Sequence, residues 1–457
     1  MNRHIALCLL VGLVVGTSGC GKNRRPYDLK HTSGRTLDQN LNPTRPEVPQ
    51  EKLQDFGFAV YWDSFIRDET IVGAYLEGDV ESWRPALPGD GKPQLYVATE
   101  KNRIYQVDPH SGMVNWVYDV GRPVAFLDRD HPVAEWVYPR DRQTRLKPYD
   151  EIYFIAQDYL YALDRDNGSE LWKVQLPFGA STPPIASATH VFVGSWDDRV
   201  YAIRKDRPEL VHWSWRTDGD LLARPVVASP NLFVPSTDGK LYTFEATTGK
   251  FKAAFNTEKR LLTDPLIYQR LLYQGAEDFN LYVMRVDDGS VVFRYNAEAP
   301  ITTAPVAVSD ALEAGVQKTV MFGAEGRGIF ALRRYPRQKD SRRGRVPHEL
   351  LWRHEKATRF LARGTQDAYL LTPGESVTES RIARVDFEDG HFRDELVLQG
   401  VDHYVTNPNS PLAIFPQESR VGGMIVLCYR NGWIICIKEL NTFPSGALPE
   451  PTTTNQK

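Results

Sequence analysis

HVFVGSWDDRVYAIRKDRPELVHWSW, residues 190–215, is the stretch that decides the fold. A short apolar run, VFVGS, is followed by a polar turn, WDDR, and by a second apolar run, VYAI. A loop then leads into a strand that carries tryptophan, HWSW. Apolar runs of this length, bounded by Gly and Asp turns, are typical of antiparallel hairpins. The stretch therefore predicts consecutive antiparallel strands.

The same unit recurs through the rest of the chain from residue 56 onward. Gly249 and Gly289, which occupy the same place in successive copies, are 40 residues apart in the sequence. A period of about 40–50 residues with four strands per unit is the signature of a β-propeller. Eight strand pairs predict an all-β, eight-bladed propeller of four-stranded antiparallel blades. The further copies begin near Gln94, Glu151, Leu232, Leu271, Thr319, Ala368 and Met424.

A glycine closes the turn after the second strand of several units, and an aromatic residue stands four positions later. Glycine tolerates the positive φ that such turns need. An aromatic side chain at a fixed place can insert between neighbouring blades and bury about 150–250 Å². The glycines are Gly112, Gly168, Gly249, Gly289 and Gly390; the aromatics are Trp116, Trp172 and Phe293, whereas Ala253 and Asp394 depart from the pattern.

The ends of the repeat predict how the ring closes. The last unit lacks an outermost strand, because the chain turns polar after Leu440. Phe58–Phe65 (FAVYWDSF) is an apolar strand with no local partner. We expect this strand to complete blade eight, which removes a sheet edge that would otherwise invite aggregation.

The first residues are typical of a targeting segment. Ile5–Val15 is an apolar run, too short for the roughly 20 residues that span a bilayer. Small residues then lead to Cys20, which resembles a bacterial lipobox, although Thr17 stands where that motif prefers Leu. We expect Cys20 to be lipidated; the alternative is an ordinary signal peptide cut near Gly19. Gly21 in place of Asp fits sorting to the outer membrane.

These features predict four segments. Residues 1–19 are a lipoprotein signal peptide, and residues 20–55 are a lipidated flexible tether, because they contain too few apolar residues to offset their ordering entropy. Residues 56–440 form the propeller, and residues 441–457 form a disordered tail. Cys428 and Cys436 lie on the two arms of one predicted hairpin. Both a disulfide and two buried free thiols are compatible with that placement.

The units also resemble the PQQ-like propeller repeat, as in Ala162-Leu163-Asp164 followed by Gly168 and Trp172. Together with the lipobox and tether, the chain resembles the BamB family of outer-membrane assembly lipoproteins. That resemblance implies a non-catalytic scaffold without cofactor or metal, lipid-anchored in the outer membrane and facing the periplasm. It implies a BamA-like assembly barrel, or another envelope protein, as the partner. A propeller that binds another envelope protein or a polysaccharide is an alternative within the same class.

The rival enzyme class is a PQQ-dependent dehydrogenase (quinoprotein), which uses the same repeat. Such enzymes resemble one another in a vicinal Cys–Cys pair over the quinone, and Cys428 and Cys436 are not adjacent. No catalytic residue, metal ligand or cofactor ligand can be assigned from the sequence. We therefore expect no enzyme activity.

Two insertions interrupt the repeat, and insertions in propellers map to surface loops where binding resides. Asp119–Asp150 carries Phe126, Trp136 and Tyr138, which are candidate partner-binding residues because aromatics are favoured interface anchors. Tyr335–Pro347 is strongly basic and is either a docking loop or simply a solvated one. The net charge of −3 gives no indication of a nucleic-acid partner, and we expect a monomer.

Overall fold

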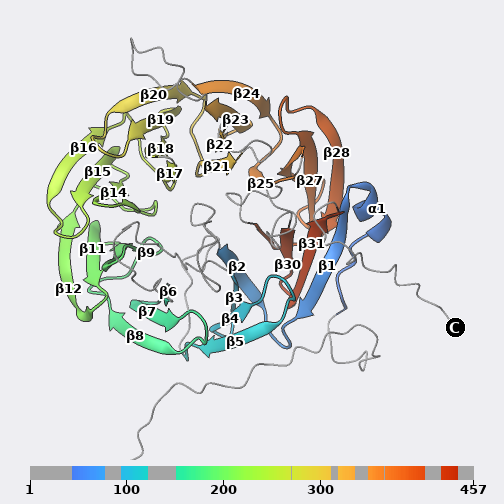
Figure 1. Ribbon diagram of the computed structural model, residues 1–457, viewed down its shortest axis with the longest axis horizontal. Helices are drawn as coiled ribbons and strands as arrows, with labels where there is room; N and C mark the ends of the chain where they lie inside the picture. The colour runs from blue at the N-terminus through green and yellow to red at the C-terminus, as the bar shows by residue number, and fades with distance from the viewer. Residues whose placement is uncertain are drawn as a thin grey trace, which may run out of the picture.

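The computed structural model describes residues 44–77, 94–121, 151–268, 270–309, 318–334, 348–364, 366–406 and 424–440. Eight antiparallel sheets stand around a common axis, and the chain passes through them in order (Figure 1). Seven sheets have four strands; the eighth has three strands within the described residues. The predicted eight-bladed β-propeller is confirmed.

Blades are numbered in chain order, and strands A to D run from the inner to the outer position of each blade. Blade 1 contains β2 (Ile71–Glu77), β3 (Gln94–Thr99), β4 (Arg103–Val107) and β5 (Val114–Asp119). Blade 2 contains β6 (Glu151–Ala156), β7 (Tyr159–Asp164) and β8 (Glu170–Gln175), which are its strands B to D. Blade 3 contains β9 (Ile185–Ala186), β10 (His190–Gly194), β11 (Arg199–Arg204) and β12 (Arg207–Arg216). Blade 4 contains β13 (Val226–Ala228), β14 (Asn231–Pro235), β15 (Lys240–Glu245) and β16 (Phe251–Asn256).

The second half of the ring repeats this arrangement. Blade 5 contains β17 (Leu266–Tyr268), β18 (Leu271–Gly275), β19 (Asn280–Arg285) and β20 (Val291–Asn296). Blade 6 contains β21 (Val306–Ser309), β22 (Lys318–Ala324), β23 (Gly328–Arg334) and β24 (His348–His354). Blade 7 contains β25 (Arg359–Arg363), β26 (Asp367–Pro373), β27 (Glu379–Asp386) and β28 (Phe392–Gln399). Blade 8 contains β29 (His403–Val405), β30 (Met424–Cys428), β31 (Trp433–Glu439) and β1 (Phe58–Phe65).

Position within a blade explains the sequence pattern of each strand. The B strands β10, β14 and β18 are buried along their whole length, because neighbouring blades cover both of their faces. Their sequences are accordingly near-continuous apolar runs. The outer strand β8 instead alternates between half-buried and exposed residues, because one face meets solvent.

The N-terminal strand closes the ring as predicted. β1 pairs antiparallel with β31, from Phe58 opposite Glu439 to Phe65 opposite Trp433. In Figure 1 the blue β1 lies alongside the red β31, so the two ends of the propeller share one blade. The last blade thereby obtains its fourth strand.

A tryptophan on a D strand locks several blades to the next one. The indole of Trp116 lies so close over Gly168 that a Cβ added to this glycine would approach the ring within 2.5 Å. Its Nε1 donates a hydrogen bond to the carbonyl oxygen of Arg165, at 3.0 Å. The predicted insertion of aromatics between blades is confirmed here. The same contact joins Trp62 to Gly112, Trp213 to Gly249 and Trp352 to Gly390.

The seam between blades 7 and 8 is built differently, because Asp394 replaces the aromatic residue of blade 7. Helix α1 (Gln50–Asp55) and the residues around it pack there instead. Phe56 and Phe58 lie 5.9 and 4.9 Å from the ring of Tyr369. Their burial allows this seam to close without an indole.

This packing moves one predicted boundary. The sequence analysis begins the propeller at residue 56 and assigns residues 20–55 to a flexible tether. In the structure, Val48 and Leu53 are already buried in the core of the seam between blades 7 and 8. A few apolar residues in a polar stretch suffice for this, because the seam offers them a ready apolar surface. The rest of the tether, the signal segment and the tail after residue 440 lie outside the described residues.

The remaining local expectations concern glycines and cysteines. The five turn glycines have φ of 69–71°, in the left-handed region, as predicted. Cys428 and Cys436 are both fully buried free thiols. Val426 pairs with Cys436 and Cys428 with Ile434, so the two cysteines are diagonal neighbours. None of the described helices is long and apolar enough to cross a membrane.

Candidate protein-binding face

The alternating strand directions place the described connections between strands on two faces of the ring. The B–C turns and the loops from strand D to the next blade lie on one face, which we call the B–C face. The A–B and C–D turns lie on the opposite face. Loops on such a face carry function in repeat architectures, because the strands hold them in fixed positions.

Four large hydrophobic side chains are exposed on the B–C face of blades 3 to 5. Trp196 in the turn β10–β11 is 54% exposed, and Phe279 in the turn β18–β19 is 43% exposed. Phe178 precedes β9 and Leu262 precedes β17, with 53% and 36% of their surfaces exposed. Exposed aromatics are favoured anchors of protein interfaces. Their grouping on one side of the ring makes this surface the candidate site.

Phe279 also has an unusual backbone conformation. Its φ is +75°, in the left-handed region that bulky side chains rarely adopt. The equivalent residue of blade 4 is Gly239, which has φ of +81°. A non-glycine residue there costs about 1–3 kcal/mol. The exposed ring of Phe279 recovers little of this cost by burial.

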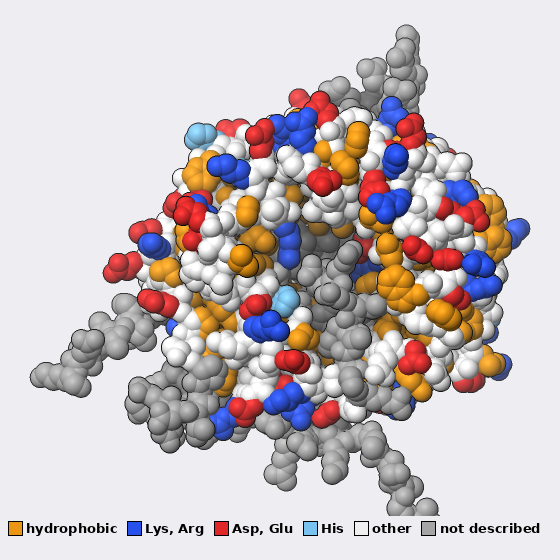
Figure 2. Space-filling model, turned by 180° about the vertical axis from the view of Figure 1, so that it is seen from behind, with side chains coloured by type: hydrophobic (Ala, Val, Ile, Leu, Met, Phe, Trp, Pro, Cys, Tyr) orange, Lys and Arg blue, Asp and Glu red, His pale blue; other side chains and the backbone are white. Residues whose placement is uncertain are grey.

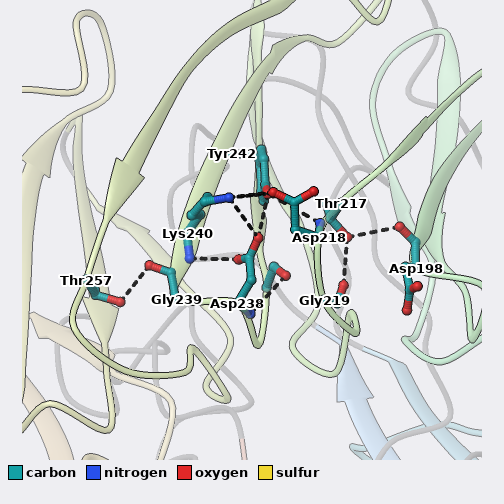
Figure 3. Close-up of polar contacts among 10 residues, drawn as sticks. Asp198, Thr217, Asp218, Gly219, Asp238, Gly239, Lys240, Tyr242 and Thr257 are labelled. Atoms are coloured by element: carbon teal, nitrogen blue, oxygen red, sulfur yellow. Dashed lines mark hydrogen bonds and ion pairs between the residues drawn. The ribbon is translucent and has the colours of Figure 1, made fainter.

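Figure 3 shows the polar contacts that fix the turns of this face. The hydroxyl of Tyr242 donates a hydrogen bond to Oδ2 of Asp238, at 2.5 Å. Blades 3 and 5 repeat the contact between Tyr201 and Asp197 and between Tyr282 and Asp278, each at 2.6 Å. Burial, and then the carboxylate partner, raise the pKa of each of the three tyrosines to about 12. The tyrosines are therefore protonated donors at neutral pH.

An ion pair ties a neighbouring loop to the turn of blade 4. Lys240 Nζ lies 2.5 Å from Oδ2 of Asp218 and 3.5 Å from Oδ2 of Asp238 (Figure 3). The hydrogen bond to Asp218 raises the pKa of Lys240 above its ordinary value, and Lys240 lowers the pKa of Asp218. Thr217 Oγ1 donates to the carbonyl oxygen of Asp198 in the previous blade, at 2.9 Å. These contacts hold the loop between blades 3 and 4 against both of its blades.

The aromatic residues of blade 3 are held in the same way. The backbone N–H of Trp196 and the hydroxyl of Ser195 both donate to the carbonyl oxygen of Gly179, at 3.0 and 2.9 Å. Phe178 precedes that glycine directly. The loops that carry Trp196 and Phe178 are therefore fixed side by side, which lowers the entropic cost of binding a partner.

The chemistry of the face is suited to binding. The carboxylates of Asp197, Asp238 and Asp278 are occupied by tyrosine hydroxyls. Within the described ranges, no group of three or more His, Cys, Asp or Glu side chains could hold a metal ion. Figure 2 shows, on the side of the molecule away from the viewer of Figure 1, acidic and basic side chains interspersed with hydrophobic ones.

The predicted site residues cannot be placed in this geometry. Cys20 and the candidate anchors Phe126, Trp136 and Tyr138 lie outside the described residues, as does the basic stretch 335–347. The sequence analysis did not single out Phe178, Trp196, Leu262 or Phe279. A signal for Phe279 was present, because it occupies the turn position that is glycine in blade 4.

Comparison with known proteins supports the family resemblance. The family model described as outer membrane protein assembly factor BamB matches residues 156–252 and 211–335. The crystal structure of BamB from Moraxella catarrhalis is similar, with a TM-score of 0.53 and 13% sequence identity. That similarity covers 81% of this chain and 99% of the other.

A computationally designed protein, Ika8, is similar in fold as well. It has a TM-score of 0.51 and 12% identity, over 81% of this chain and 97% of the other. No curated protein sequence matches the chain significantly. The predicted resemblance to PQQ-like, BamB-type propellers is thus confirmed. At 12–13% sequence identity, the two solved structures support the fold alone.

Proposed function

We propose that this chain is a non-catalytic, lipid-anchored scaffold of the outer membrane that faces the periplasm and binds a barrel-assembly protein. The match to the BamB family model supports the assembly role. Lipidation at Cys20 and the position in the outer membrane are part of the proposal and rest on the sequence motif. The partner is a BamA-like barrel component.

The observation that carries the binding role is Phe279. An exposed aromatic ring is kept in a left-handed backbone conformation, at a position where glycine would avoid the strain. Natural sequences retain such costs at functional sites. Together with Trp196, Phe178 and Leu262, it supplies an apolar surface with polar surroundings, which is the usual composition of an interface. Phe126, Trp136 and Tyr138 are proposed as a second contact region.

Photo-crosslinking in intact cells tests the proposal. A photoreactive phenylalanine analogue is placed at Phe279 and, in a second variant, at Trp196. Phe392, which is 48% exposed on the outer strand β28 of blade 7, is the matched control. We expect a BamA-type barrel protein to crosslink from both face positions and not from Phe392. Equal crosslinking from all three positions, or recovery of other proteins alone, would refute the assignment of the face and the partner.

Lipid anchoring has a separate test. Cys20→Ala is expected to release the protein from the membrane fraction while the propeller stays folded. Metabolic labelling with an alkyne fatty acid should mark the wild type and not the variant. Labelling of Cys20→Ala, or membrane retention without any label, would contradict the proposed anchor.

A further inference from the structure

In four seams, a tryptophan on strand D packs over the C–D turn glycine of the next blade; we call this contact the tryptophan lock. The seam between blades 4 and 5 has the glycine, Gly289, but no tryptophan. Gly289 has φ of +69°, like the four glycines that lie under an indole. Ala253 occupies the tryptophan position on β16, so no described side chain comes within 4 Å of a Cβ added to Gly289. Ala253 is exposed and Gly289 is half-buried. We call this opening, between Ala253 and Gly289, the 4–5 slot.

Another side chain makes the hydrogen bond that the indole N–H would make in this seam. In the filled seams, the indole Nε1 bonds the carbonyl three residues before the glycine, as Trp213 does with Ala246 at 3.2 Å. The corresponding carbonyl here belongs to Val286, and the side-chain amide of Asn231 donates to it at 2.8 Å. Asn231 in turn accepts from Lys252 Nζ at 2.6 Å. The seam therefore satisfies its backbone without filling the space of an aromatic ring.

The two blades do not close over the empty space. Two residues beyond Ala253, the ring of Phe255 packs against Tyr282 of blade 5, with centroids 5.1 Å apart. This contact joins the two blades directly beside the slot. A space of this kind that remains open loses the dispersion contacts of its lining, and a ring inserted from outside would restore them.

We propose that the 4–5 slot binds an aromatic side chain, preferably tryptophan, of a partner protein. The molecule itself defines the occupant, because equivalent positions bury Trp62, Trp116 and Trp352 to 7%, 5% and 6% exposure. The backbone oxygen of Val286 has a second lone pair that an indole N–H can reach. Asp288, exposed beside Gly289, adds a negative charge at the opening that favours a basic residue next to the tryptophan.

This site is independent of the face proposed above. The C–D turn that contains Gly289 lies on the face opposite to Trp196 and Phe279. A partner bound at the 4–5 slot would therefore contact the outer rim of the disc and leave the B–C face open. The chain would then present two separate surfaces for two segments of one partner or for two partners.

The test is ligand-observed fluorine NMR with the full-length protein. The probe is the dipeptide N-acetyl-Lys-(5-fluoro-Trp)-amide, whose signal broadens when it binds. We expect broadening with the wild type, reversed by N-acetyl-Lys-Trp-amide and not by N-acetyl-Lys-Leu-amide. Ala253→Trp should fill the slot from within and weaken probe binding at least tenfold. Val377→Trp, which adds an indole at a remote exposed turn of blade 7, is the matched control.

Several outcomes would overturn the proposal. No broadening with the wild type, or equal broadening with Ala253→Trp, would show that the slot does not select an indole. Broadening that appears only after Trp136→Ala would show that the chain fills the slot itself. If Ala253→Trp does not fold by circular dichroism, Ala253→Leu blocks the same space with a smaller side chain, and the same loss of binding is expected.

Discussion

The indole Nε1 of Trp62 donates a hydrogen bond to the carbonyl oxygen of Pro109, at 2.7 Å. Trp62 belongs to β1 of blade 8, and Pro109 to the C–D turn of blade 1. The N-terminal strand therefore closes the ring twice, by pairing with β31 on one side and by locking onto blade 1 on the other.

Removal of this lock should cost more stability than removal of an exposed tryptophan. Trp62→Ala deletes a side chain that is 7% exposed, and we expect a loss of about 3–5 kcal/mol in the free energy of unfolding. Trp196→Ala, at 54% exposure, is the control and should leave stability nearly unchanged. Urea denaturation followed by circular dichroism measures both. Similar losses in the two variants would contradict the role of the lock.

Phe279→Gly should separate stability from binding. Glycine relieves the left-handed strain, so we expect the unfolding free energy to stay level or rise by up to about 1 kcal/mol. Loss of the exposed ring should at the same time reduce partner crosslinking from Trp196. Thermal unfolding and the crosslinking assay are compared on the same variant. A clear loss of stability would mean that the ring serves the fold and not a partner.

The contact between buried His190 and exposed His212 should make the protein sensitive to acid. His190 Nε2 lies 2.8 Å from His212 Nδ1, and burial, followed by His212, lowers the pKa of His190 to about 4. Arg204 and Lys205 nearby also lower the pKa, and Asp206 raises it.

Because the unfolded histidine titrates near pH 6.5, the unfolded state binds the extra proton first. Stability should therefore fall between about pH 6.5 and pH 4, by on the order of 2 kcal/mol. His190→Gln should flatten this part of the stability profile, measured by urea denaturation at several pH values. An unchanged slope in the variant would assign the acid sensitivity to other groups.

Loss of a tyrosine hydroxyl on the B–C face should reduce stability more than loss of the exposed ion pair beside it. Tyr242→Phe removes the donor to Asp238 and should cost about 1 kcal/mol. Asp218→Asn removes an exposed charge and should leave stability unchanged at moderate salt. Chemical denaturation distinguishes the two variants. A loss for Asp218→Asn as large as that for Tyr242→Phe would mean that the ion pair stabilises the turn as much as the hydroxyl does.

Cys428 and Cys436 should be unreactive in the folded protein. Both thiols are fully buried, and burial raises the pKa of each well above its ordinary value. Iodoacetamide at pH 8 should modify neither in native conditions and both in denaturant, as measured by mass spectrometry. Modification of the native protein within minutes would indicate that blade 8 opens locally.

The sequence was sufficient for the fold because each unit carries its own signals. Hairpin turns, the glycine at positive φ and the aromatic four residues later predicted the blades, and unpaired Phe58–Phe65 predicted the closure. The contribution of α1 could not be predicted, because the surface that buries Val48 and Leu53 exists only once blades 7 and 8 have formed. The candidate face was missed for a similar reason. Phe178, Trp196, Leu262 and Phe279 are far apart in sequence, and exposure is a property of the folded ring.

The pairing of β1 with β31 also sets the order of events when the chain is made. Phe58 and its partner Glu439 are among the first and the last residues of the propeller to leave the ribosome. β1, an apolar strand of eight residues, therefore stays unpaired until the last blade has been synthesised. The protein is most prone to aggregation during that interval. A chain truncated before residue 433 would lack β31 altogether, so β1 would stay unpaired.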